Sequence, residues 1–120
     1  MAKTVLVIDD DPSFLRFLNF HLVKSGYQVV TVDGAEQAMK ILFNQPVDLV
    51  LTDMRMPQLD GCDIVYALKQ SYPKIPVLVC SAHPESNRLE QALRFTDVRF
   101  VRKPFMIEDI FSAINDLIKN

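Results

Sequence analysis

The chain has 120 residues, of which 49% are hydrophobic and 23% are charged. These proportions are typical of a folded globular protein, and the length suits one domain rather than two. The formal net charge of −2 argues against a protein built around a nucleic-acid or membrane surface. No apolar run approaches the roughly 20 residues that cross a bilayer. We therefore expect one domain over residues 1–120, without a membrane segment and without direct binding of nucleic acid.

The cellular compartment is predicted from the cysteines and the start of the chain. Cys62 and Cys80 lie far apart and outside any CxxC or Cys–His pattern. This favours reduced thiols over a disulfide framework or a zinc site. Met1 to Thr4 lead directly into an apolar run, without the pattern of a signal peptide. We expect a cytoplasmic protein.

The first strand and helix have clear boundaries in the sequence. Residues 4–8 form a short apolar run rich in β-branched residues, which predicts a buried strand. A helix is expected to start at Pro12, with Asp11 as its N-cap, and to end near Gly26, which tolerates a positive φ. Its apolar side is expected to contain Phe14, Leu15, Phe17, Leu18, Leu22 and Val23.

The remainder of the chain repeats this alternation of strand and helix. Further strands are predicted at 27–32, 47–53, 75–80 and 98–101, and further helices at 35–44, 62–71, 85–94 and 105–118. Alternation with short loops implies parallel strands joined by right-handed crossovers, with helices on both faces. The predicted fold is therefore α/β, a flavodoxin-like, doubly wound (βα)5 arrangement around a five-stranded parallel sheet.

Polar residues stand at the carboxyl ends of four predicted strands. They are Asp9 and Asp10, then Asp53, Ser81 and Lys103. The ends of parallel strands meet at one edge, where ligands of open α/β sheets bind. Carboxylates suit Mg²⁺, while a lysine and a hydroxyl donate to phosphoryl oxygens. Taken singly, each residue could be a cap, a loop acid, a turn residue or a surface lysine, but their joint placement favours a phosphoryl site.

The same residues carry a family resemblance over essentially the whole chain. The ordered motifs resemble receiver domains of two-component response regulators, of the single-domain chemotaxis or phosphorelay type. The spacings from Asp53 to Ser81 and from Ser81 to Lys103 are those of the family. The motifs are Val-Leu-Val-Ile-Asp9-Asp10, Asp53-Met-Arg-Met-Pro57 with Asp60-Gly61, Cys80-Ser81-Ala82 and Lys103-Pro104-Phe105.

The resemblance implies a phosphoacceptor switch. Asp53 would take a phosphoryl group from a phosphohistidine of a sensor kinase or phosphotransfer protein. Mg²⁺, or Mn²⁺ in its place, would be held by Asp10, Asp53 and the Arg55 backbone carbonyl, with Asp9 acting through water. Ser81 and Lys103 would bind phosphoryl oxygens. Such a protein catalyses its own phosphorylation and dephosphorylation and is otherwise not an enzyme.

Other roles follow from the same resemblance. Ser81 and Phe100 would form a two-state switch, in which Phe100 turns into space that Ser81 vacates; the simpler alternative makes Phe100 a buried strand aromatic only. The Lys103–Pro104 peptide bond is expected to be cis. Arg55 and His83 would tune the lifetime of the phosphorylated form, although His83 is equally suited to a solvated loop.

The output surface is expected over residues 85–94, 98–101 and 105–118. Its partner is an unknown protein or a second copy, and a basic bias there favours acidic partners or salt bridges between receivers. One departure from the family concerns the end of the helix at 85–94, where Thr96-Asp97 replaces the usual Gly-Ala. We expect that helix end to fray or shift, because a favourable cap is lost. The basic residues are Arg88, Arg94, Arg99 and Arg102.

Two other functions compete with the phosphoacceptor. A receiver-like module that binds partners without phosphorylation predicts a missing site residue, and none is missing. A phosphatase with an aspartyl nucleophile usually needs a second carboxylate two residues after the first. Arg55 stands at that position, which makes the phosphatase the weaker alternative.

Overall fold

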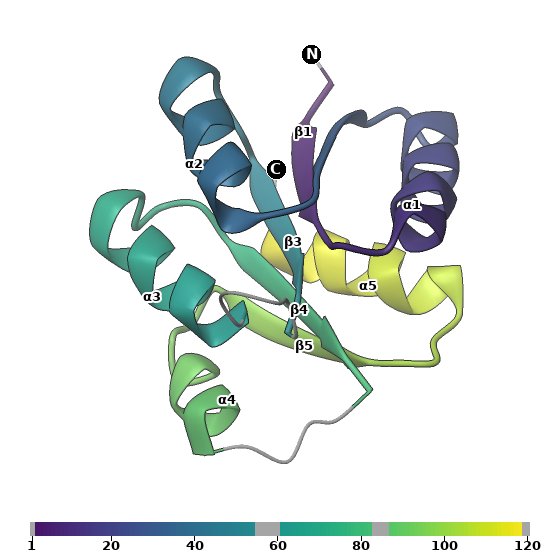
Figure 1. Ribbon diagram of the computed structural model, residues 1–120. Coiled ribbons are helices and arrows are strands. Elements are labelled where there is room, and N and C mark those ends of the chain that lie inside the picture. Colours follow the sequence, from purple (N-terminus) through teal and green to yellow (C-terminus); the bar gives the residue numbers. More distant parts are fainter. Residues whose placement is uncertain (1, 55–60, 83–86, 119–120) are drawn as a thin grey trace.

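The computed structural model describes residues 2–54, 61–82 and 87–118, and within them five strands alternate with five helices (Figure 1). All strands are parallel and lie in one sheet in the order β2-β1-β3-β4-β5. The predicted doubly wound (βα)5 fold is confirmed. The elements are β1 (Thr4–Ile8), α1 (Pro12–Lys24), β2 (Gln28–Val32), α2 (Ala35–Asn44), β3 (Leu49–Asp53), α3 (Gly61–Ser71), β4 (Val77–Ser81), α4 (Asn87–Ala92), β5 (Val98–Arg102) and α5 (Ile107–Leu117).

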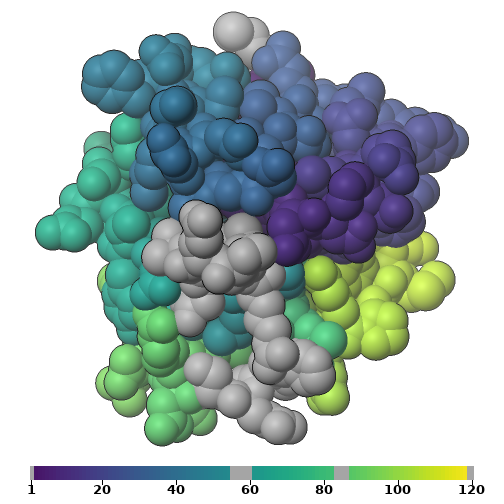
Figure 2. Space-filling model, viewed as in Figure 1, coloured from purple at the N-terminus to yellow at the C-terminus, as the bar shows by residue number. Residues whose placement is uncertain are grey.

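Helices cover both faces of the sheet. Helices α2, α3 and α4 pack on one face, and α1 and α5 lie together on the other, as the ribbon and the space-filling view show (Figures 1 and 2). Alternate residues of β1 enter the two cores, Leu6 and Ile8 on the first face, Val5 and Val7 on the second. Because both faces are covered, the central strands are continuous apolar runs.

The start and end of α1 follow the sequence signals. Asp11 is the N-cap, and its Oδ1 accepts a hydrogen bond from the Ser13 N–H at 3.0 Å. Pro12 occupies the first helical turn, where its missing N–H costs nothing. Gly26 follows the helix with a φ of 97°, a value that suits glycine. These local contacts fix where the chain leaves β1 at the edge of the sheet.

The expected apolar side of α1 was too wide. Leu18 and Leu22 are fully buried, but Phe17 and Val23 are 39% and 52% exposed. Successive helical residues are turned by about 100°, so side chains next to the buried pair in sequence point away from the sheet. The prediction that Phe17 and Val23 face the core is therefore wrong.

Several boundaries differ by one or two residues from those expected. Strands β2, β3 and β4 begin later than predicted, and β4 and β5 end one residue later. Pro76 directly precedes β4, and a proline has no N–H to donate to a ladder. Helix α5 begins at Ile107 rather than 105, because Met106 is extended and its N–H donates to Asp109 Oδ2 at 2.9 Å.

Helix α4 ends earlier than predicted. Its last helical residue is Ala92, and the chain leaves through tighter turns in which Phe95 N–H donates to the Ala92 carbonyl at 3.3 Å. In the described part of the chain, no residue other than glycine has a positive φ. No left-handed cap therefore follows this helix among the described residues, as expected where Thr96-Asp97 replaces Gly-Ala. The start predicted for this helix lies outside the described residues.

Among the helices that the structure describes, none is long and apolar enough to cross a membrane.

Candidate functional site

The carboxyl edge of the sheet brings the predicted site residues together. Asp9 directly follows β1, Asp53 ends β3, Ser81 ends β4 and Lys103 directly follows β5. The strand register aligns these ends, because Asp53 on β3 is paired with Cys80 on β4, and Ser81 on β4 is paired with Arg102 on β5. Ser81 and Lys103 each come one residue after these paired positions on their own strands, at the same edge of the sheet as Asp53. The Lys103 N–H also donates to the Ser81 carbonyl at 2.9 Å, which ties the two strand ends together.

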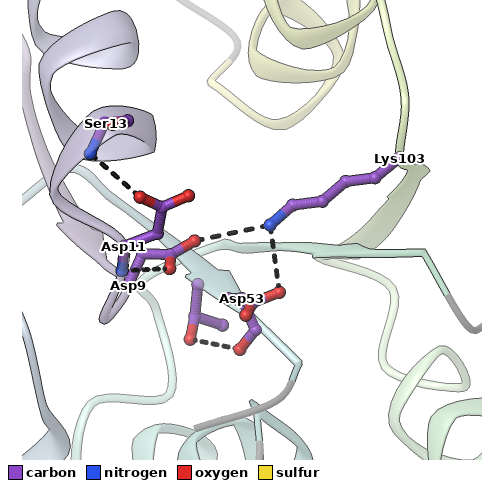
Figure 3. A network of polar contacts seen from close by, with 6 residues as sticks. Asp9, Asp11, Ser13, Asp53 and Lys103 are labelled. Carbon is purple, nitrogen blue, oxygen red and sulfur yellow. Dashed lines mark hydrogen bonds and ion pairs between the residues drawn. The ribbon is translucent and has the colours of Figure 1, made fainter.

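The ammonium of Lys103 lies between two carboxylates (Figure 3). Its Nζ is 3.2 Å from Asp53 Oδ1 and 3.5 Å from Asp9 Oδ2. Burial lowers the pKa of Lys103, but the charges of Asp53 and Asp9 outweigh burial and raise this pKa above its usual value. The lysine therefore stays cationic throughout the physiological pH range.

Asp9, Asp10 and Asp53 form an acidic cluster. Each offers one carboxylate oxygen, and these oxygens lie within 4.8 Å of one another. Asp9 is buried, Asp53 is partly buried and Asp10 is exposed. Three carboxylates face one ammonium, an arrangement in which carboxylates either bind protons or hold a cation. Oxygen ligands with an exposed side for water fit Mg²⁺.

Asp9 shows the cost of this arrangement. The pKa of Asp9 is raised from 3.8 to about 6, chiefly by burial. The negative charge of Asp53 contributes to this rise, whereas the Asp11 N–H, which donates to Asp9 Oδ1 at 2.9 Å, and the Lys103 ammonium act in the opposite direction. A divalent cation would favour the ionised carboxylate in the same place.

The thiol beneath the site is inert. Cys80 is fully buried and unoxidised, and burial raises its pKa to about 12. Cys62 is also a buried, reduced cysteine. Both sites match the expectation of reduced thiols, and neither cysteine supplies a nucleophile to the acidic cluster.

A close backbone contact positions the end of β3. The N–H of Gly61, the first residue of α3, donates to the Met54 carbonyl at 2.7 Å. A Cβ at Gly61 would lie 2.7 Å from the Asp53 carbonyl oxygen and 2.9 Å from Met54 Cα. Only glycine permits this approach, so Gly61 supports the backbone of Asp53. From the sequence, Gly61 was named only as part of the Asp60-Gly61 motif that precedes the predicted helix at 62–71, and it was given no role at the site.

Phe14 is a second residue of the site that the sequence analysis assigned only to the core. Its ring centroid lies 4.1 Å from Lys103 Nζ. Phe14 lies in the first turn of a helix that starts at the site, and this position was a usable signal of a role there. Helical periodicity by itself, however, places Phe14 on the apolar side of α1.

The remaining predicted residues are placed as follows. Ser81 is buried at 2% exposure. Phe100 is partly buried on β5 and packs against the core on the α3–α4 side. The Lys103–Pro104 peptide bond is cis. Arg55 and His83 lie outside the described residues, and their roles stay predictions.

The fold and this edge site define the class of protein: a flavodoxin-like α/β domain with an acidic, lysine-containing site at the carboxyl ends of its strands. The family model for the response regulator receiver domain matches residues 5–115. The chain belongs to this family. Receiver domains are signalling modules of two-component systems that interact with sensor kinases or phosphotransfer proteins, and they typically bind Mg²⁺ at an acidic pocket.

Individual relatives agree with this assignment. The transcriptional regulatory protein KdpE of Mycobacterium tuberculosis is 33% identical over 115 residues, covering 96% of this chain and 50% of KdpE. The transcriptional regulatory protein GlrR of Escherichia coli is 30% identical over 115 residues, covering 96% of this chain and 26% of GlrR. This chain thus spans between a quarter and half of these curated relatives. A receiver domain crystal structure from Clostridium thermocellum superposes with a TM-score of 0.88 at 30% identity, covering 97% and 94% of the two chains.

Proposed function

We propose that residues 1–120 act as one phosphoacceptor unit, in which Asp53 receives a phosphoryl group from a phosphohistidine of a sensor kinase or phosphotransfer protein. The observation that supports this most directly is the position of Lys103. Its ammonium is 3.2 Å from Asp53 Oδ1 at the edge of an acidic cluster that includes Asp9 and Asp10. A nucleophilic carboxylate, a neighbouring cation and further carboxylates for a metal are the groups that phosphoryl transfer requires.

The transfer step uses the chain's own groups in defined roles. An Asp53 oxygen attacks phosphorus, and the new P–O bond replaces the P–N bond to the donor imidazole, whose leaving nitrogen takes up a proton from water. Lys103 and the Ser81 hydroxyl bind the phosphoryl oxygens while negative charge shifts among these oxygens during the transfer. Asp10, Asp53, the Arg55 carbonyl and, through water, Asp9 are the proposed Mg²⁺ ligands, and the ion supplies positive charge against the phosphoryl oxygens.

Phosphorylation is proposed to change the surface formed by α4, β5 and α5. Ser81 moves toward the phosphoryl group, and Phe100 turns inward on β5. The position of Phe100 supports this, because it is partly buried against the core beneath α3 and α4.

The proposed basic output face is modified by intramolecular contacts. Arg88 on α4 forms an ion pair with Asp63 on α3, and Arg99 Nη1 donates to the Thr96 carbonyl at 2.9 Å. Part of the positive charge on this face is therefore compensated within the chain. An acidic partner, or a second copy, would compete with Asp63 for Arg88. Reversing the charges of Arg88 and Arg99 should weaken such association.

The phosphoacceptor role is tested with acetyl phosphate and Mg²⁺. The wild-type chain should gain the mass of one phosphoryl group, labile at alkaline pH as an acyl phosphate is. Asp53→Asn should abolish the gain while the circular dichroism spectrum is retained. Asp116→Asn, a change of an exposed carboxylate on α5, is the matched control and should behave as wild type. Phosphorylation of Asp53→Asn would refute the assignment, and an unmodified wild type would favour the phosphorylation-independent interaction module.

A further inference from the structure

The Lys103 ammonium has a third neighbour besides its two carboxylates. Its Nζ lies 4.1 Å from the centroid of the Phe14 ring, well inside the range of a cation–π contact. The Lys103 side chain is 26% exposed, so the contact lies in a partly desolvated place. Such contacts are stronger when water is excluded, because the ring quadrupole then acts on the cation with little screening.

The Phe14 ring is itself held in place. Phe105 meets it edge to face, with centroids 5.8 Å apart and an interplanar angle of 69°. Both phenylalanines are partly buried and belong to the core that α1 shares with α5. In the space-filling view, the purple start of α1 borders the yellow-green segment that leads into α5 (Figure 2). Because Phe105 is two residues after Lys103, the segment that carries the lysine also packs against the ring that faces it.

The two kinds of partner respond differently to phosphorylation. When Asp53 becomes an acyl phosphate, the oxygen next to Lys103 loses its full charge, and the phosphoryl oxygens take over as acceptors. The shorter carboxylate contact, to Asp53, therefore changes during the reaction, and among the two carboxylates only Asp9, 3.5 Å away, keeps its charge. The attraction of an aromatic face does not depend on the ionisation or esterification of Asp53.

We propose that Phe14 is a positioning residue for phosphoryl transfer, whose ring face keeps the Lys103 ammonium at the site while its acceptor changes from Asp53 to the phosphoryl group. This inference rests on the proposed phosphoacceptor role of Asp53. In this role Phe14 acts on the reaction through its contact with Lys103. A purely structural role would instead require only an apolar side chain of similar size at this position.

Substitutions that separate shape from ring electronics test the proposal. Phe14→Leu keeps an apolar side chain without a ring, and Phe14→Tyr keeps the ring. With acetyl phosphate and Mg²⁺, we expect Phe14→Leu to be phosphorylated roughly fivefold more slowly, from a contact of about 1 kcal/mol, and Phe14→Tyr to remain close to wild type. Phe17→Leu, at an exposed position on the same helix, is the matched control and should not change the rate.

Two measurements exclude a mere packing effect. In the unphosphorylated wild type, the ε-CH2 protons of Lys103 should show an upfield ring-current shift by NMR, which Phe14→Leu abolishes and Phe14→Tyr preserves. Fluorinated phenylalanines placed only at position 14 keep the ring's shape but weaken its negative face, so the phosphorylation rate should fall with each added fluorine. Equal rates across the fluorinated series, or an unshifted Lys103 signal in wild type, would overturn the inference.

The outcomes also separate this inference from the function on which it rests. If wild type is phosphorylated at Asp53 and every Phe14 variant matches it, the inference fails and the proposed function stands. If wild type takes up no phosphoryl group, the proposed function fails and the positioning role fails with it.

Discussion

Two regions of this molecule contain clusters of opposite charges, and they differ in how the charges are matched. At the carboxyl edge of the sheet, Lys103 meets Asp53 at 3.2 Å and Asp9 at 3.5 Å, and Asp10 adds a third carboxylate to the cluster. Between α3 and the segment from α4 to β5, charges of opposite sign meet in pairs. The pairs there are Lys69 with Asp97 and Asp63 with Arg88.

The ion pairs between α3 and the segment from α4 to β5 have a structural role. Lys69 is only 7% exposed, and its Nζ lies 2.5 Å from Asp97 Oδ2 and 2.8 Å from the Ile75 carbonyl. One turn earlier on α3, Tyr66 packs edge to face against Phe95 and its hydroxyl lies 3.4 Å from Gln91 Oε1. The buried ammonium has acceptors of its own, which is the condition for a buried charge to be tolerated.

The comparison shows how a structural ion pair differs from a functional cluster of the same residue types. Lys69 and Asp97 neutralise each other, so this ion pair needs neither a proton nor a cation from solution. The carboxylates of Asp9, Asp10 and Asp53 exceed the charge of Lys103, which favours an added cation, while burial and, to a smaller extent, the charge of Asp53 raise the pKa of Asp9. Unmatched charge at a sheet edge is thus the physical mark of the site.

The largest effect is expected from Asp9 in the absence of divalent cations. Its pKa is about 6 in the folded protein against 3.8 without the fold, so the folded state holds this proton at pH values where the unfolded state has released it. The resulting stability is fully present below pH 3.8 and is lost as pH rises through about 6. The loss amounts to as much as about 3 kcal/mol of unfolding free energy.

Urea unfolding at a series of pH values measures this loss, and Asp9→Asn should remove it. The quantity of interest is the difference in pH slope between wild type and variant, because other groups titrate in both. Identical slopes for the two proteins would show that the pKa of Asp9 is not raised in the folded state.

A slightly smaller effect is expected from Mg²⁺ at pH 7. An ion that binds only the folded state, at 100 times its dissociation constant, adds about 2.7 kcal/mol to the free energy of unfolding. Asp10→Asn should strongly reduce this gain, because it removes one of the three converging carboxylates. Asp63→Asn removes a carboxylate from the paired region instead and should leave the Mg²⁺ effect unchanged. A gain of equal size in all three proteins, measured by urea unfolding, would contradict the assignment of the metal ligands.

The smallest effect concerns the paired region itself. Lys69→Met removes a buried ammonium, so the Asp97 carboxylate and the Ile75 carbonyl lose their donor. The Asp97 side chain is 32% exposed. We expect a loss of about 2 kcal/mol in unfolding free energy, since Asp97 recovers part of its solvation. Lys40→Met is the matched control, because Lys40 and Glu36 are 3.9 Å apart and largely exposed. Mg²⁺ should stabilise Lys69→Met as much as wild type; a lost Mg²⁺ response would mean that the two regions are coupled.

Much of this protein was predictable from local patterns. Each strand is short and apolar, Asp11 and Pro12 start α1, and parallel strands must end at one edge, so Asp9, Asp53, Ser81 and Lys103 could be placed near one another. Boundaries were less predictable, because the last residues of an element depend on single contacts. The N–H of Met106 on the Asp109 carboxylate, which delays α5, is one example.

The sequence by itself determined the order of strands and helices and the set of polar groups at the sheet edge, because both depend on periodicity and on the common direction of the strands. Only the tertiary structure decided which groups touch. The ring of Phe14 over Lys103, the approach of Gly61 to Asp53 and the pairing of Lys69 with Asp97 join residues on different elements. Such contacts depend on the rotation of each helix about its own axis and on its position on the sheet. Helical periodicity shows which side of a helix is apolar, but it does not determine this rotation closely enough to say which side chains touch.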